Sequence, residues 1–556
     1  MIPLEACCCV GEFVVSTHHR LLQPLPRRAL FTTALAGGTI LGMGRSQVAR
    51  AEAPVRGGNL SIALFPEPSL LTAALTTAGP TTIISGKVFD GLLTYGFDLK
   101  PQPLLATDWK SSRDGLAITL TLRPGVTWHD GKSFTSADVA YSVMEIWKKY
   151  HGRGRSTYAN VVGVDTPDPT TAILRLAKPA PFILNALASM ESQVLPRHLY
   201  ENTDPLTNPR NVAPIGTGPF QFVEWQRGGY VLLKRYPGYW DQPKPYLDQI
   251  VYRFIPDAGS RAAALESGDV QMVGESSVPG HDIGRLGKLP QIELDTRGYE
   301  YGSSIALIEF NLDRPAFKDV RVRQAIAHAL NREFIGQAIW YGYGKPATGP
   351  IPPSFPAFYS ADVPLYPFDQ KRAIALLDEA GLKPDGAGTR LSITHDYMPY
   401  GEPYQRTGDY FREALGHIGI KVSIRTQDYA AFAKRVYTDR DFDTTNYSAA
   451  TGPDPAIGVQ RFYWSRNFHP GVAFSNGSHY VNAEVDSLLE SAQVEVDPKR
   501  RHELYARFQA LAQRDLPEIP LVAYDQVTLT NKRLREHTTT AEGIHANFAG
   551  TYLLPA

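Results

Sequence analysis

Cysteine is scarce in this sequence. The 556 residues include only three cysteines, Cys7, Cys8 and Cys9, and all of them stand at the beginning of the chain. If an N-terminal segment is removed, the mature protein has no cysteine, which excludes disulfide bonds, thiolate nucleophiles and cysteine-based metal sites. A chain longer than about 250–300 residues can fold without disulfide bonds because its hydrophobic cores are large enough.

Net charge and long apolar runs are also absent. The 56 Lys and Arg residues balance 56 Asp and Glu residues. Because a nucleic-acid or anionic-membrane surface needs a concentrated basic face, we expect no nucleic-acid partner. After the N-terminal segment, no uninterrupted apolar run approaches the roughly 18 residues of a membrane-spanning helix. We therefore expect a soluble mature chain, and its length predicts two or three domains.

The usual catalytic motifs are missing as well. His502-Glu503 begins a zinc-protease pattern, but Ala506 stands where the second histidine is needed. No Gly-x-Ser-x-Gly or Ser-x-x-Lys motif occurs, and the histidines are scattered without an i, i+4 pair that could chelate a metal. His129-Asp130 is a turn pattern and not a catalytic pair, because adjacent strand side chains point in opposite directions. We expect no enzyme, no metal site and no cofactor.

What the N-terminus does have is a signal-peptide pattern. Arg27-Arg28 precedes a modestly apolar run from Ala29 to Met43, and Ala49-Arg50-Ala51 follows as a small-residue cleavage pattern. The paired arginines predict a twin-arginine signal peptide over residues 1–51, with an ordinary secretory signal as the alternative. The cysteines precede the apolar run, which is the wrong side for a lipoprotein. We expect a periplasmic protein that is exported, cleaved and not lipid-anchored.

From Gly57 onward, short strands alternate with helices. Apolar alternation predicts strands at 59–64, 117–122, 231–233 and 250–254. Thr135 and Asp138 form a capping box, and three further helices have a capping residue at their start: Asp319, Asn331 and Asp369. Arg321 and Arg323 are expected on a solvated helix face. Strand, helix, strand and helix follow one another between 391 and 442, which indicates α/β packing. Two late helices and a final strand are expected at 482–492, 499–514 and 519–523.

Three stretches, in their order along the chain, point to a known family. The first reads Leu122-Arg123-Pro124-Gly125-Val126-Thr127-Trp128-His129-Asp130-Gly131 and the second Gly216-Thr217-Gly218-Pro219-Phe220. The third reads Phe317-Lys318-Asp319-Val320-Arg321-Val322-Arg323-Gln324-Ala325. They resemble the peptide/nickel family of ABC-transporter solute-binding proteins, whose members bind dipeptides, oligopeptides and related solutes.

This resemblance implies an architecture. It is an α/β, three-domain periplasmic binding protein of the cluster-C type, with two lobes that close on a ligand cleft. Domain I would be discontinuous, and the implied ranges are 55–98, 213–302 and 520–556 for domain I, 99–212 for domain II and 303–519 for domain III. The resemblance also implies a monomer that captures a solute and passes it to the permease subunits of an ABC importer.

The loop at 446–455 is the most informative part of the resemblance. In peptide-binding relatives it offers an aspartate to the ligand's amino terminus, and dipeptide receptors place an arginine for the ligand carboxylate on the loop at 395–400. Here Thr451 and Met398 stand at these two positions, and both depart from a zwitterionic dipeptide site. Asp454 is retained, either as a ligand contact or as the cap of the Asp-Pro turn. The candidate ligand-binding residues are Glu67, Tyr158, Tyr397, Met398, Asn446, Tyr447, Thr451, Asp454 and Trp464.

We therefore predict a receptor for a peptide or peptide-like solute. Aromatic side chains and backbone groups would bind this solute, with few salt bridges. Each aromatic candidate could instead pack in a core. The alternatives are a non-peptide solute in the same fold, such as an opine, a glycoside or an aromatic metabolite, an exported hydrolase, and a sensory or chaperone role.

Overall fold

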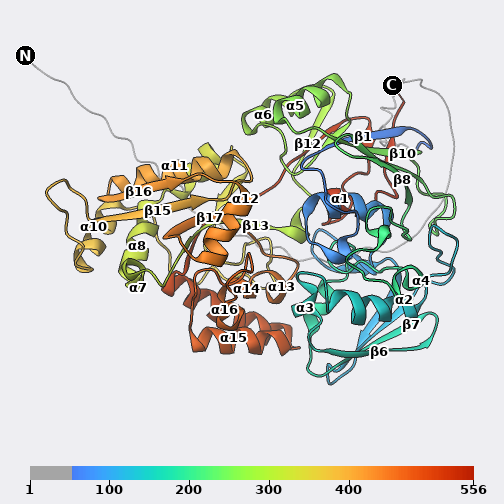
Figure 1. The fold of residues 1–556 in the computed structure, drawn as a ribbon, viewed down its shortest axis with the longest axis horizontal. Helices are drawn as coiled ribbons and strands as arrows, with labels where there is room; N and C mark the ends of the chain where they lie inside the picture. Colours follow the sequence, from blue (N-terminus) through green and yellow to red (C-terminus); the bar gives the residue numbers. More distant parts are fainter. Residues whose placement is uncertain (1–52, 556) are drawn as a thin grey trace, which may run out of the picture. The chain divides into compact units, whose positions relative to one another are not determined.

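The computed structural model describes residues 53–555 as a mixed α/β fold with three larger sheets (Figure 1). The predicted signal peptide, residues 1–51, lies outside the described residues. Within residues 53–555, no helix is long and apolar enough to cross a membrane.

A seven-stranded sheet is assembled from separated parts of the chain. Its strand β1 (Asn59–Leu64) runs parallel to β10 (Gln249–Phe254) and to β11 (Met272–Val273), which requires long connections between them. Leu60 and Ile62 of β1 are fully buried, as their alternation predicts. The other strands of this sheet are β8 (Phe220–Gln226), β9 (Tyr230–Arg235), β12 (Ile292–Asp295) and β19 (Thr528–Asn531). Three helices lie between strands of this sheet along the chain: α1 (Gly79–Val88), α5 (Ala258–Ser267) and α6 (Gly280–Leu286).

A four-stranded antiparallel sheet shares a hydrophobic core with the first one. Its strands are β4 (Ala106–Ser111), β5 (Ala117–Leu122), β6 (Val161–Asp168) and β7 (Thr171–Leu176). The capping box of Thr135 and Asp138 begins α2 (Ser136–Tyr141), which continues as a π-helix from Ser142 to Trp147. We refer to these two sheets with their helices as the first lobe.

The second lobe is built on a six-stranded sheet. Its strands, in spatial order, are β14 (Gly344–Pro346), β18 (Glu518–Tyr524), β13 (Ser304–Phe310), β17 (Thr444–Ala450), β15 (Leu391–Tyr397) and β16 (Ile420–Arg425). β15 runs parallel to both β16 and β17. The helix α11 (Glu402–Gly416) connects β15 to β16, as the predicted alternation of strand and helix requires.

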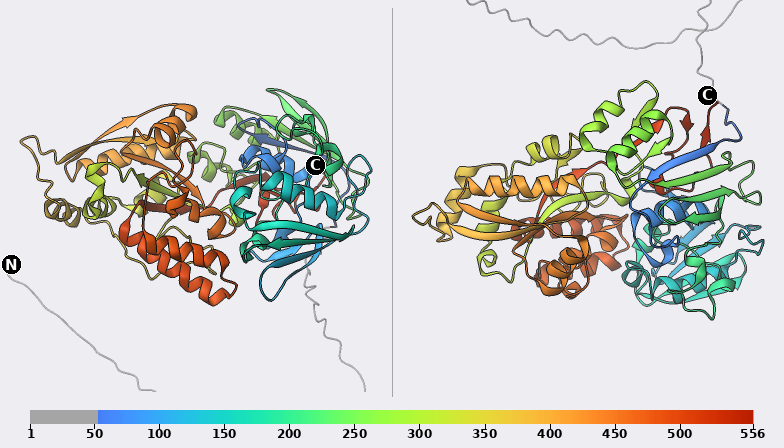
Figure 2. Two further views of the ribbon diagram at one scale, coloured as in Figure 1. Left: turned by 60° about the horizontal axis from the view of Figure 1, so that its bottom comes forward. Right: turned by 45° about the horizontal axis from the view of Figure 1, so that its top comes forward.

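Two separate cores cover the faces of this sheet. Ile308 and Phe310 of β13 pack with α11 and with two other helices, α8 (Val320–Ala329) and α10 (Gln370–Glu379). Leu307 faces the opposite core, which contains α15 (Ala483–Val494) and α16 (Pro498–Asp515). These two helices lie side by side in Figures 1 and 2.

Many of the predicted elements are confirmed with their boundaries. β1 and β5 match the predicted strands residue for residue. The side chains of three predicted caps each accept a hydrogen bond from the first turn of their helices: Asp319, Asn331 and Asp369. Gly216-Thr217-Gly218 leads into β8 at Phe220, and a Cβ on Gly216 would lie 1.9 Å from the Val88 carbonyl oxygen, so only glycine fits there.

One prediction about a helix face is wrong. Arg321 is exposed and pairs with Asp319, but Arg323 is buried. Its guanidinium donates to the backbone carbonyls of Asp515 and Leu516 at 3.1 and 3.0 Å, so it closes the end of α16 instead of meeting solvent. The proposed domain limits remain a prediction, and the limit between 519 and 520 falls inside the single strand β18.

Candidate ligand site

The candidate site lies at the end of β17, where its neighbour β15 stops pairing with it. β15 and β17 pair over three positions, which end at Tyr397 opposite Asn446. On its other edge, β17 pairs with β13 as far as Ala450. The Met398 amide donates to the Asn446 carbonyl at 3.0 Å, so the backbone groups of Asn446 face β15.

Ser448 and Ala450 therefore direct their backbone groups to an open edge. The N–H and C=O of a strand residue point to the same edge, and the direction alternates from one residue to the next. Among the backbone hydrogen bonds of residues 53–555, none meets Ser448 or Ala450 on this edge. The Ala450 carbonyl has one side-chain contact there, an Arg461 nitrogen at 3.5 Å.

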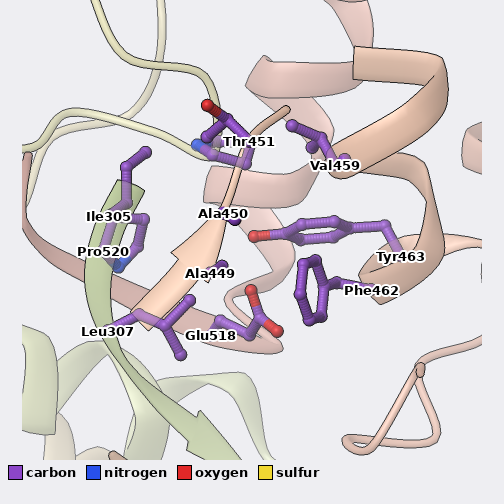
Figure 3. Close-up of a pocket in the computed structure, with 12 residues that line it drawn as sticks. Ile305, Leu307, Ala449, Ala450, Thr451, Val459, Phe462, Tyr463, Glu518 and Pro520 are labelled. Carbon is purple, nitrogen blue, oxygen red and sulfur yellow. The ribbon is translucent and has the colours of Figure 1, made fainter. Parts of the chain in front are cut away.

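A small pocket with a free volume of about 10 Å³, roughly that of one water molecule, lies on one face of the sheet, beside this edge (Figure 3). Residues of three neighbouring strands line it: Ile305 and Leu307 of β13, Ala449 and Ala450 of β17 with Thr451 after it, and Glu518 and Pro520 of β18. Val459 and two residues of the short helix α14 (Gln460–Tyr463), Phe462 and Tyr463, form the facing wall. In Figure 3, Thr451 lies at the upper end of the pocket and the Glu518 carboxyl at the lower end.

Asp454 connects the two lobes. It is fully buried and caps the short helix α13 (Pro455–Gly458) by accepting a hydrogen bond from the Ala456 amide at 2.9 Å. Its two carboxylate oxygens each accept a hydrogen bond of 2.7 Å from the Arg501 guanidinium. Asn185 of the first lobe adds a third partner, because its Nδ2 donates to Oδ2 of Asp454 at 2.9 Å.

The segment around α13 makes further contacts with the first lobe. Ala456 and Ile457 belong to the hydrophobic cluster of that lobe. The amide and the hydroxyl of Thr451 both donate to the Ser303 carbonyl, each at 2.8 Å, in the connection that leads into β13. The end of β17 is thus held at the boundary of the two lobes by a neutral contact and a buried ion pair.

Two arginines lie at this boundary, and their partners differ. Arg153 forms a two-point ion pair with the buried Glu191. Burial acts to lower the pKa of Arg153, but the charge and hydrogen bonds of Glu191 outweigh it and raise that pKa. Arg461, by contrast, has no carboxylate within 4.0 Å among residues 53–555 and donates only to the carbonyls of Gly458 and Ala450. Burial and the nearby charge of Arg153 lower the pKa of Arg461 to about 10.

The structure brings several predicted site residues together at this place. Asn446, Tyr447 and Thr451 lie on β17 or directly after it, and Tyr397 and Met398 stand at the end of the neighbouring β15. All five are largely buried. Asn446 binds the His395 ring and the Tyr404 carbonyl, and the Tyr447 hydroxyl donates to Glu518 at 3.1 Å. Their role in ligand binding stays a prediction.

The other predicted residues make contacts elsewhere. Tyr158 is fully buried beside Trp147, with a ring distance of 5.0 Å and a hydroxyl bonded to Ser192. The Trp464 ring donates to Glu490 of α15 at 2.9 Å. Glu67 accepts hydrogen bonds from the Trp225 ring and the Gly228 amide, both at 2.9 Å. His129 and Asp130 bind different partners, Gly218 and His198, as a turn predicts.

Three residues of this site escaped the sequence analysis: Arg461, Glu309 and Glu518. A visible signal existed for Glu309, because it stands as a single charge in the apolar strand Ile305 to Phe310. Glu518 similarly begins the apolar strand β18. Arg461 had no local signal, since an arginine on a short helix is usually solvated.

Comparison with known proteins settles the family. Residues 100–469 match the model of the bacterial extracellular solute-binding proteins, family 5 Middle. The chain belongs to family 5. A relative of this receptor, the glutathione-binding protein GsiB of Salmonella typhi, is 30% identical over 460 residues, which cover 81% of this chain and 86% of GsiB.

Solved structures of similar proteins agree with this family 5 fold. The oligopeptide-binding protein AppA of Bacillus subtilis, in complex with a nonapeptide, is 27% identical with a TM-score of 0.77. AgaA of A. tumefaciens R10, in complex with agropinic acid, is also 27% identical, with a TM-score of 0.76. The match covers 90% of this chain in both cases, with 100% of AppA and 99% of AgaA.

These findings confirm three predictions. The family resemblance is correct, the fold class is that of the family 5 periplasmic binding proteins, and the chain is the solute-binding component of an ABC import system. The family is one of binding proteins that capture a ligand for a permease.

Proposed function

We propose that this family 5 receptor captures a peptide-like solute that bears a carboxylate and holds it against the end of β17. The observation that carries this proposal is the open edge at Ser448 and Ala450. An extended peptide can add to such an edge through main-chain hydrogen bonds, which supply affinity without requiring a particular side chain. The open edge of β17 lies at the boundary of the two lobes, which suits the addition of an extended peptide.

Arg461 supports a carboxylate on the ligand. Its guanidinium is half-buried and lies beside the Ala450 carbonyl, with no acidic partner within 4.0 Å among residues 53–555. A cation in such a place is costly unless an anion accompanies it, and a guanidinium can bind a carboxylate through two hydrogen bonds. A carboxylate of the bound solute would supply that anion.

The known relatives agree with a peptide-like ligand. GsiB is named as a glutathione-binding protein, AppA was solved with a nonapeptide, and DppA of Helicobacter pylori, 25% identical, was solved with the peptide STSA. The second candidate is a non-peptide carboxylic acid such as an opine, which is favoured by the complex of AgaA with agropinic acid and by the neutral Thr451.

The remaining properties belong to the same proposal. The receptor acts in the periplasm after export by the twin-arginine route and cleavage near residue 51, without a lipid anchor and as a monomer without enzymatic activity. Its three domains follow the ranges predicted above. The arginine pair Arg27-Arg28, the position of the cysteines and the absence of a membrane-spanning helix in residues 53–555 support this description.

Native mass spectrometry of the purified protein tests the ligand class. We expect a co-purified solute with amide bonds and at least one carboxylate. A thermal-shift screen of short peptides, their C-terminal amides and opines then ranks the classes. Recovery of a neutral sugar or of an aromatic compound without a carboxylate would contradict the proposal.

Arg461→Gln gives a direct check of the carboxylate contact. Trialanine should bind this variant about tenfold or more weakly than the wild type, because a charge-assisted hydrogen bond is lost, whereas trialanine amide should bind both proteins alike. Calorimetry measures both affinities. Arg466→Gln is the matched control, because this nearby arginine is exposed and already pairs with Glu490. Equal effects of the two variants would exclude Arg461 as the contact.

A further inference from the structure

Two neighbouring carboxyl groups lie in the second lobe, one of them in the wall of the pocket. Glu309 of β13 and Glu518 of β18 are direct neighbours across the strand ladder. Both are buried, with 0% and 2% of their surface exposed. Glu309 shares the face of Ile305 and Leu307, because alternate residues of a strand point to the same side. Glu518 itself lines the pocket.

Neither carboxyl has a cationic partner among residues 53–555. Among residues 53–555, the polar neighbours of the Glu309 carboxyl are neutral, the Tyr447 hydroxyl and the Ser478 amide, and Gly477 packs so closely that a Cβ there would lie 2.6 Å from Oε1. Glu518 accepts a hydrogen bond from the Tyr447 hydroxyl at 3.1 Å and has the neutral Tyr463 hydroxyl as a second neighbour. Burial, and for Glu309 also the charge of Glu518, raises the pKa of both groups, that of Glu518 to about 7.

The charged and titratable groups that face this pair do not neutralise it. They are Arg440, Arg461, Tyr437, Tyr447 and Tyr463. Arg440 already binds Asp313 at 2.7 Å and Asn311 at 2.8 Å. Arg461 forms no ion pair within 4.0 Å in the described chain, and the three tyrosines carry no charge at neutral pH.

Two adjacent buried carboxyls without a counterion are a costly arrangement, and they keep a proton until a cation arrives. The pocket provides access for one. Its walls are apolar, formed by Leu307, Pro520 and Phe462, and it reaches from Thr451 at the boundary of the lobes to Glu518 (Figure 3). The free volume of about 10 Å³ is roughly that of one water molecule, so the pocket takes a group of the size of an ammonium beside Glu518 while the rest of the ligand stays outside.

We propose that this pocket receives an ammonium group of the bound solute, with Glu518 as its counterion and Glu309 behind it. The proposal rests on the peptide-like ligand proposed above and adds that the ligand carries a cation in addition to its carboxylate. The ammonium comes either from a free amino terminus or from a basic side chain, and these two sources are distinguished by the choice of probes.

Two pairs of peptides serve as probes in titration calorimetry. N-acetyl-trialanine lacks the amino-terminal charge of trialanine and carries an acetyl group in its place. N-acetyl-Ala-Lys-Ala and N-acetyl-Ala-norleucine-Ala differ only in the side-chain charge. We expect the wild type to bind the charged member of at least one pair about tenfold or more tightly, as a charge-assisted contact predicts, and the pair that shows the preference identifies the source.

Glu518→Gln should reduce this preference to less than about threefold, because the isosteric amide keeps the volume and removes the charge. Glu542→Gln is the matched control. Glu542 is also buried, and burial raises its pKa to about 7, but it lies in the first lobe and accepts hydrogen bonds from Thr94 and the Tyr95 amide. This control should keep the full preference of the wild type.

Ala449→Leu provides a second test that leaves both carboxyls in place. The larger side chain overfills the small pocket, so the charged probe should lose its advantage, and the overpacking should lower the free energy of unfolding by about 1–3 kcal/mol without unfolding the protein. If the peptides bind but charged and uncharged members do not differ, or if Glu518→Gln keeps the preference, the ammonium site is refuted while the peptide receptor stands. If no peptide binds, the proposed function fails and the ammonium site with it.

Discussion

At the scale of single residues, the boundary between the lobes is governed by how each buried charge is paired. Asp454 satisfies a helix cap, an arginine and an asparagine at once, whereas Arg461 and Glu518 lack an oppositely charged partner in the described chain. A paired charge holds the structure together, and an unpaired one is available to a ligand. A buried acidic or basic residue at this boundary therefore stabilises the fold where it is paired, and is a candidate ligand contact where it is not.

Asp454→Asn tests the structural half of this distinction. Asparagine can still cap α13, but Arg501 loses its countercharge in a buried place, so we expect a loss of about 3–5 kcal/mol in the free energy of unfolding. Urea unfolding followed by circular dichroism measures it. Asp319→Asn is the matched control, since Asp319 also caps a helix and pairs with an arginine, but at the surface. It should cost less than about 1 kcal/mol. Equal losses would show that the buried pair of Asp454 and Arg501 stabilises the fold no more than the exposed pair of Asp319 and Arg321.

At the scale of elements, the decisive feature is the difference in length between neighbouring strands. β17 continues to Ala450 beside β13, but its pairing with β15 ends at Asn446. The chain leaves β15 at Tyr397 and soon enters α11, which begins at Glu402. The end of β17 is thereby left with one paired and one free edge, as a strand-adding ligand requires.

Ala450→Pro tests the free edge. Proline removes the Ala450 amide, which points away from β13, so the sheet should tolerate it while peptide affinity falls about tenfold from the lost hydrogen bond. Calorimetry with trialanine measures the affinity, and thermal melting reports the fold. Ala449→Pro is the control for the direction of the amide. The Ala449 amide faces β13, so its loss should destabilise the sheet. Unchanged peptide binding by Ala450→Pro would refute the role of this edge.

At the scale of the whole molecule, buried ionisable groups make stability depend on pH. Burial raises the pKa of Glu518 to about 7 and of Asp90 to about 6. Burial also lowers the pKa of His129 and His395 to about 4. The stability that the protonated carboxyls contribute is complete below their unfolded pKa, at about 4, and is lost as pH rises through their folded pKa. The histidines, neutral in the fold, weaken it as pH falls below about 6.5, the value in the unfolded chain.

Comparing Glu518→Gln with the wild type isolates one of these groups. The folded pKa of Glu518 exceeds its unfolded value, so the ionised carboxyl costs stability as pH rises from about 4.5 to about 7. The amide cannot ionise. We therefore expect the melting temperature of the variant, relative to the wild type, to rise by a few degrees between pH 5 and pH 8. Thermal melts of both proteins across this range measure it, and a constant difference would contradict the burial of an ionising carboxyl.

Much of the fold could be predicted because it depends on local chemistry. The alternation of Leu60, Ile62 and Leu64 is enough for β1, and an aspartate before a run of helix formers is enough for the start of α8 or α10. The prediction failed for Arg323, which binds the carbonyls of Asp515 and Leu516, almost two hundred residues away in sequence. Local pattern cannot distinguish a solvated arginine from one that closes a distant helix.

For this protein, then, the sequence by itself determined the elements, the family and the absence of cysteine after the first nine residues. It also placed Thr451 and Asp454 in the segment that follows β17, and their role in ligand binding stays a prediction. Only the tertiary structure decided that Asp454 is occupied by Arg501, that Ser448 and Ala450 have a free edge, and that Glu309 and Glu518 meet across two strands. The reason is physical: burial and pairing are properties of neighbours in space, and neighbours in space come from residues that are distant in the chain.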